Sequence, residues 1–240
     1  MRASAIQSNL MFGNPDPYGA NVVLLMHFDG DYVDKSPLAQ AFTSTGATLS
    51  AAGAKFTQSV AINGTNPGGG GSNGVQSNSS RSEYDVTTGD MTMEAWVNPD
   101  STVPNGVGAR PIISLTTSGI GNGGAAISLS GDATGTFFRF DINGTFTMSS
   151  ATSSVYLTTG TWYHVAVSRQ GITTRLFVNG ALVDSATNGV WGSATSRVAV
   201  IGNFFGGTQG LHGKVDEARV TKAARYPAAF KLPDSPFQNP

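Results

Sequence analysis

The chain has 240 residues, no cysteine and a net charge of −1, and only 12% of its residues are charged. The lack of cysteine excludes a disulfide framework, a thiolate nucleophile and a cysteine-ligated zinc site. The near-neutral charge excludes a strong electrostatic grip on nucleic acid or an anionic membrane. Charged residues are half as frequent as the ~25% of average soluble domains. The polar positions are mostly Ser, Thr, Asn and Gly, which suit strands and turns.

Residues 1–20 show no strand alternation and carry two prolines near their end, so we expect an extended N-terminal arm that is packed on a partner or disordered. Leu10 and Phe12 are its candidate partner-binding residues, since a few apolar side chains allow an arm to fold against a partner. Residues 1–10 lack an apolar core, so no signal peptide is expected. The longest apolar run, Val22–Met26, is too short for membrane insertion.

The strongest strand signals lie in three segments. Val22–Phe28 is apolar on both alternating faces, which predicts a strand covered on both sides. Met91–Val97 and Thr161–Arg169 alternate cleanly, and the second opens a three-stranded meander with Asn-Gly at one turn. Asn66–Ser80 is rich in Gly and Ser and is expected to form a mobile surface loop. Further predicted strands are Lys55–Ile62, Pro111–Leu115, Ala125–Leu129, Thr136–Asp141, Thr145–Met148, Thr173–Val178, Ala181–Ser185, Arg197–Gly202 and Leu211–Val220.

The whole pattern is one of about twelve to fourteen short strands, and no stretch has a sustained helical period. The sequence therefore predicts an all-β domain and, at this length, a two-sheet antiparallel β-sandwich. We expect residues 21–235 to form the sandwich and residues 236–240 to form a C-terminal tail.

Four segments together resemble a known family: Val22–Pro37, Met91–Pro99, Thr161–Ala186 and Leu211–Pro233. In order and spacing they are similar to the laminin-G-like, concanavalin A-like lectin/glucanase jelly roll, and WYHVAVSR followed by LFVNG is the most specific element. The opening VVLLMHFDG and the closing VDEARVTKAARYPAAF resemble versions found in tailed-bacteriophage virion proteins. The resemblance implies two curved sheets with rim loops open for binding. It implies no single activity, because the fold hosts enzymes, lectins and structural modules.

Catalytic chemistry finds little support in the sequence. Glycoside hydrolysis needs two carboxylates about 5–5.5 Å or 6.5–9.5 Å apart, and Glu94 has no acidic residue two positions away on either side. Glu83 and Asp85 are interpreted as solvated loop carboxylates, and no Gly-x-Ser-x-Gly elbow occurs. We therefore assign no catalytic residue and expect a non-enzymatic protein. The histidines, each in a predicted strand, are interpreted as packing residues: His27, His164 and His212.

A structural calcium ion is the most plausible small ligand. Carboxylate oxygens suit Ca²⁺, and similar domains place the first and last strands side by side. The candidate ligands are therefore Asp29, Asp34 and Asp216. In the alternative interpretation, Asp29 and Asp34 cap turns and Asp216 pairs with Arg219.

Exposed aromatic residues are the candidates for binding a sugar or a neighbouring protein subunit. Trp191 lies in a turn-rich stretch, and Phe204 and Phe205 precede Gly-Gly, so these three are expected to be exposed in loops. Trp96 and Trp162 alternate with small or apolar residues and are expected to fill the core.

Two functions remain open. The first is a non-enzymatic structural module on a bacteriophage virion surface, a capsid decoration or accessory protein assembled in the host cytoplasm. Its partners would be the major capsid protein or neighbouring appendage subunits, with a homotrimer as one possible state. The second is a carbohydrate-binding adhesin, a tail-fibre or lectin-like module that binds host glycans. We rank the first higher because no dense charged or aromatic cluster marks a sugar site.

Overall fold

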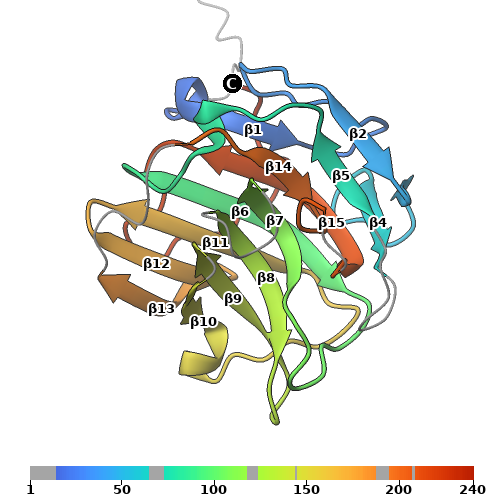
Figure 1. The fold of residues 1–240 in the computed structure, drawn as a ribbon, viewed down its shortest axis with the longest axis vertical. Coiled ribbons are helices and arrows are strands. Elements are labelled where there is room, and N and C mark those ends of the chain that lie inside the picture. Colours follow the sequence, from blue (N-terminus) through green and yellow to red (C-terminus); the bar gives the residue numbers. More distant parts are fainter. Residues whose placement is uncertain (1–14, 65–72, 118–123, 144, 188–194, 207–208) are drawn as a thin grey trace, which may run out of the picture.

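The computed structural model describes residues 15–64, 73–117, 124–143, 145–187, 195–206 and 209–240. Two antiparallel sheets pack face to face (Figure 1), which confirms the all-β prediction and is consistent with a jelly roll. The helical elements of the described residues are short 3₁₀ turns at Gly19–Asn21 (η1), Ser82–Tyr84 (η2) and Ser150–Ser153 (η3). Among these described residues, none forms a helix long and apolar enough to cross a bilayer.

Sheet A has eight strands in the order β13-β12-β11-β6-β15-β4-β3, and β1 also pairs with β15. The predicted meander is its β11–β13 portion, and the first and last strands of the chain are neighbours as the resemblance implied. The strands are β1 (Val22–Met26), β3 (Ala47–Ser50), β4 (Ser59–Asn63), β6 (Met91–Pro99), β11 (Tyr163–Gln170), β12 (Thr173–Val178), β13 (Ala181–Thr187) and β15 (His212–Thr221).

Sheet B has seven strands in the order β10-β9-β8-β7-β14-β5-β2. The strands are β2 (Phe42–Thr45), β5 (Gly74–Ser77), β7 (Arg110–Thr116), β8 (Ala125–Gly131), β9 (Thr136–Ile142), β10 (Thr145–Ser149) and β14 (Val198–Ile201).

The prediction of a surface loop over Asn66–Ser80 was wrong in its second half, where β5 lies between β14 and β2. Val75 is fully buried, and one apolar side chain plus backbone pairing on both edges is enough to hold so short a strand. Gly74 fits because a Cβ there would lie only 2.7 Å from the carbonyl oxygen of Ile201. The first half of that segment, residues 65–72, lies outside the described residues.

The core lies between the sheets and takes alternate residues from each strand. On β6, Met91, Met93, Ala95 and Val97 face this core, as the alternation predicted. The opposite face of β6 is also buried, although it points away from sheet B. Around Thr92 and Glu94 it is covered by residues 222–240, which have no regular secondary structure and end near β1 (Figure 1), and at Trp96 it is covered by Lys55 and Phe56.

Candidate functional site

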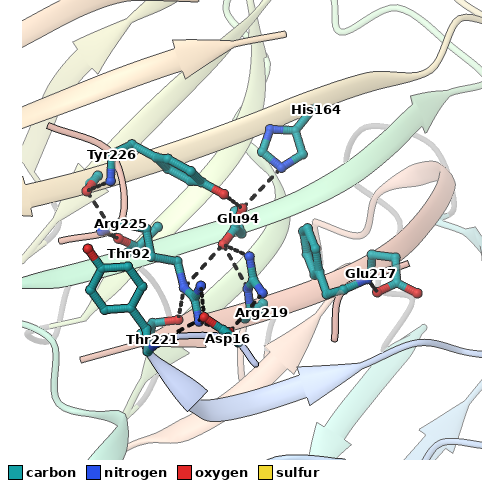
Figure 2. A network of polar contacts seen from close by, with 12 residues as sticks. Asp16, Thr92, Glu94, His164, Glu217, Arg219, Thr221, Arg225 and Tyr226 are labelled. Atoms are coloured by element: carbon teal, nitrogen blue, oxygen red, sulfur yellow. Dashed lines mark hydrogen bonds and ion pairs between the residues drawn. The ribbon is translucent and has the colours of Figure 1, made fainter. Parts of the chain in front are cut away.

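A network of buried charges fastens the C-terminal segment to the outer face of sheet A (Figure 2). Glu94 on β6 accepts hydrogen bonds from Arg219 Nε at 2.9 Å and from the Tyr226 hydroxyl at 2.7 Å, and His164 Nε2 lies 3.2 Å away. Burial alone would raise the pKa of Glu94. The positive charges of Arg219 and its neighbours outweigh burial and hold that pKa well below its usual range.

The same network anchors the end of the predicted N-terminal arm. Asp16 receives two hydrogen bonds from Arg225, at 2.9 and 2.6 Å, and lies 3.6 Å from Arg219 Nη1. This bidentate geometry is the strong form of an arginine–carboxylate pair. Residues 15–18 therefore pack on their own sandwich, whereas Leu10 and Phe12 lie outside the described residues.

The predicted C-terminal tail is packed on sheet A as well. Phe237 is buried against Val22 and Leu25, and its N–H donates to Glu217 Oε2 at 2.8 Å. His27, which follows β1 instead of lying inside it, contacts the same carboxylate at 2.8 Å. Burial alone would lower the pKa of His27, but the Glu217 carboxylate raises it. The chain itself thus covers much of this face of sheet A, and a concavity of about 270 Å³ remains beside Asp16, Arg219, Arg225 and Phe237.

The three candidate calcium ligands have different surroundings. Asp34 is buried and its oxygens accept four hydrogen bonds from its own chain, three from backbone N–H groups and one from the Ser36 hydroxyl. Asp29 accepts one hydrogen bond, from the Gln58 N–H at 3.0 Å. Among the described residues, no three Asp, Glu, His or Cys side chains gather in one place.

Asp216 is the candidate ligand with an unused oxygen. Its Oδ2 accepts from the Phe56 N–H at 3.1 Å, while its buried Oδ1 has no hydrogen-bond partner. Burial, together with the negative charges of Glu217 and Asp29, raises the pKa of Asp216 to about 7. The predicted pairing of Asp216 with Arg219 was wrong. A β-bulge lies between these two residues, with Glu217 at φ 52°, and Arg219 reaches Glu94 instead.

The interpretation of Asp85 as a solvated loop carboxylate was wrong. It is buried, and its Oδ1 lies 3.2 Å from Arg197 Nη2 and accepts from the Thr87 N–H. Glu83, in contrast, lies on η2 and is only partly buried.

The two tryptophans among the described residues pack on the outer side of sheet A. Trp96 is buried there and not in the core, because its ring packs edge-on against His164 and beneath the Lys55 ammonium, 3.8 Å from the ring centroid. Trp162 is partly buried and its Nε1 donates to the Gly53 carbonyl. Trp191 lies outside the described residues.

An open concavity lies on the outer face of sheet B, which the C-terminal segment does not cover. Over β2, β5 and β14 it has a volume of about 330 Å³, and we call it the polar groove. The polar groove is lined by Thr43, Thr45, Gln76, Asn78, Asn203 and Phe204. A narrower crevice over β7, β8 and β9 is also lined by Phe204, so this ring forms a wall common to both.

The chemistry of the polar groove is neutral. Thr43 Oγ1 donates to Asn78 Oδ1 at 2.7 Å, and the described lining offers only hydroxyl, amide and apolar groups. The expectation of an exposed Phe204 was wrong: its ring is buried against Ala109 and Ala126 and anchors the loop after β14. Phe205 beside it is partly buried. Sequence reasoning missed the groove because its residues come from β2, β5 and the loop after β14, and neither β2 nor β5 was predicted.

A two-sheet antiparallel sandwich with a concavity on one outer face is the architecture of a concanavalin A-like jelly-roll domain. The chain belongs to the concanavalin A-like lectin/glucanases superfamily, since the family model Laminin_G_3 matches residues 69–229. No curated protein matches the chain significantly.

Solved structures share this fold at low sequence identity. Domain 4 of AbnA, an extracellular arabinanase of Geobacillus stearothermophilus solved with arabinotriose, has a TM-score of 0.60 and 19% identity, over 86% of this chain and 95% of that one. The binding domain of Paraclostridial Mosquitocidal Protein 1 has a TM-score of 0.61 and 13% identity, over 87% of this chain and 50% of that one. The chain thus spans half the length of that toxin binding domain. A SAP-like pentraxin from Limulus polyphemus has a TM-score of 0.51 and 16% identity, over 70% of this chain and 77% of that one.

Proposed function

We propose that the chain is a non-catalytic binding module that takes a neutral glycan in its polar groove. The observation that carries this proposal is the neutral lining of hydroxyl and amide groups around a volume of about 330 Å³. Such groups suit the hydroxyls of a sugar, and concave sites with a few placed polar groups are the usual form of small-ligand sites. The arabinotriose complex of a similar fold supports the same ligand class.

The carboxylates that could have served hydrolysis support a non-catalytic role. Glu94 is fully buried and is neutralised by Arg219, and Asp85 is buried against Arg197. Neither carboxylate faces the polar groove, so neither can meet a substrate bound there. A general acid must lie within hydrogen-bond reach of its substrate.

The glycan proposal predicts a loss of affinity when the groove amides are shortened. Combining Gln76→Ala with Asn78→Ala removes two side-chain hydrogen-bonding groups, so we expect glycan affinity to fall by roughly tenfold. Calorimetric titration with ligands selected from a panel of neutral oligosaccharides measures this loss. Thr187→Ala, on an exposed position of β13, is the control and should bind as the wild type does. Equal affinity in the double variant and the control would contradict the proposed groove.

We also propose that the module is carried on a bacteriophage virion as a capsid decoration or accessory protein. The resemblance of its opening and closing segments to virion proteins supports this role. The anchoring of Asp16 gives the preceding residues a fixed point of attachment. Deleting residues 1–14 leaves that anchor in place, so we expect an unchanged Tm together with reduced incorporation into particles. Full incorporation of the shortened chain argues against an arm-mediated attachment.

We further propose that Asp29 and Asp216 contribute to a structural Ca²⁺ site. Asp216 fits this role because its buried Oδ1 has no hydrogen-bond partner and because the negative charges of Glu217 and Asp29 act on it, a repulsion that a hard cation would relieve. Asp34 fits less well than the sequence suggested, since its oxygens are already used by its own chain.

Calcium is therefore expected to raise the Tm of the wild type by several degrees at pH 7.5, and EGTA is expected to reverse the rise. Asp216→Asn should abolish the response, while Asp100→Asn, at an exposed position, should retain it. Differential scanning calorimetry with and without Ca²⁺ measures both. If neither Ca²⁺ nor EGTA changed the Tm of the wild type, the proposal that Asp216 is a calcium ligand would be contradicted.

A further inference from the structure

Buried arginines in the described residues have partners, with one exception. Three of them donate to a carboxylate or to backbone carbonyls: Arg169 to Gly89 and Thr87, Arg197 to Asp85, and Arg219 to Glu94. Arg110 is the fourth buried arginine, with 8% of its surface exposed. Its Nη1 atom is buried and has no hydrogen-bond partner.

No carboxylate of the chain neutralises Arg110. All 15 acidic residues lie in the described segments, and none of them forms an ion pair with this guanidinium. Burial lowers the pKa of Arg110, and no acidic neighbour offsets that effect. An arginine side chain nevertheless stays charged in a protein. Arg110 is thus a buried cation without a counter-ion among the described side chains.

The position of Arg110 separates it from the polar groove. It is the first residue of β7 and pairs in register with Leu129 of β8, whose side chain belongs to the core. Directly opposite residues of an antiparallel pair share a face, so Arg110 points toward the space between the sheets, at the end of the strand. The polar groove lies on the other face of sheet B.

Burying an unpaired charge is costly, and native proteins compensate for it with a partner or a bound ion. We propose that Arg110 anchors a binding site for a small oxyanion, a phosphate, sulfate or carboxylate group supplied from outside the chain. The planar guanidinium binds such groups through two parallel hydrogen bonds, and the unpartnered Nη1 offers one of the donors.

The test compares thermal stability in chloride, phosphate and acetate at equal ionic strength. Phosphate at about ten times its dissociation constant should raise the Tm of the wild type by about 3 °C beyond any general salt effect. In phosphate, the Tm of Arg110→Met should rise only by the general salt effect. In chloride, this variant should melt no lower than the wild type, because a buried unpaired charge has been removed. Arg139→Met is the matched control: its guanidinium is paired with Asp141, so the phosphate response should remain.

A direct measurement keeps the proposal testable if a variant folds poorly. Titration of the wild type with inorganic phosphate, followed by ³¹P line broadening, should saturate, and Arg110→Lys should bind more weakly because a lysine lacks the planar fork. The acetate arm distinguishes carboxylate from phosphate as the preferred group. Equal Tm increments in the wild type and Arg110→Met, or no saturable binding of phosphate or acetate to the wild type, would overturn the proposal.

Discussion

Replacing Glu94 with alanine is expected to lower the free energy of unfolding by about 3–5 kcal/mol, because buried Arg219 loses its hydrogen-bonded carboxylate and keeps only the more distant Asp16. Arg219 would lose its carboxylate partner at 2.8 Å, and the Tyr226 hydroxyl would lose its acceptor at 2.7 Å. Denaturant unfolding at pH 7 measures the change. Glu83→Ala provides the control, since its partly buried carboxylate pairs with no cation, and its effect should stay within about 0.5 kcal/mol.

The charge of Glu94 also predicts how stability depends on pH. Its pKa in the folded state lies well below its usual range, so its contribution is present above about pH 5 and is lost as the pH falls. Glu94→Gln should therefore flatten the decline in stability between about pH 5 and pH 3. If Glu94→Ala cost less than about 1 kcal/mol, the network of Figure 2 could not be the main attachment of the C-terminal segment.

Truncating the chain after Ala228 is the second change with a large expected effect. It removes Phe237, which is 6% exposed, and Phe230, which stacks on Tyr226 at 3.6 Å between ring centroids. Burying one such phenylalanine contributes about 1.5–3 kcal/mol. Glu217 would also lose the N–H that donates to it. We expect a loss of about 4 kcal/mol or more, with fluorescent dye binding to the newly exposed apolar face.

Calorimetry and 8-anilinonaphthalene-1-sulfonate fluorescence measure the two consequences of this truncation. Gln238→Ala, at an exposed position in the same segment, should change neither. A truncated chain that melts with the wild type and binds no more dye would show that residues 229–240 contribute little to the outer face of sheet A.

The central strands were predictable because their local signals agree with their final environment. In β6 and β11, alternation places Met93 and Val165 in the core, and the Asn179-Gly180 turn fits the left-handed backbone of Asn179 at φ 50°. Val22–Phe28 correctly indicated a strand covered on both sides, although β1 ends at Met26. Strands β2 and β5 could not be recognised, since both have only four residues, mostly Thr, Ser and Gly, and carry little periodic signal.

The candidate site was less predictable because its residues meet only in three dimensions. Glu94 and Tyr226 are 132 positions apart, and no local pattern marks their contact. Asp16 and Arg225 are 209 positions apart and join the predicted arm to residues that follow the last predicted strand. Arg110 gave no signal either, since a buried charge and an exposed one look alike in sequence. The sequence suggested that Asp216 pairs with Arg219. This pairing could not be tested from the sequence, because the β-bulge between the two residues places Arg219 opposite Glu94.

The two ends of the described chain meet. A Cβ placed on Gly19 would lie 3.2 Å from the Cα of Pro240, while the hairpin between β8 and β9 lies at the opposite end of the long axis (Figure 1). A domain with adjoining ends can be grafted into a loop of a host protein with little distortion, or relinked so that the chain starts elsewhere. A sandwich inserted in this way would be attached to its host through its adjacent ends, and the β8–β9 hairpin would lie farthest from the point of attachment.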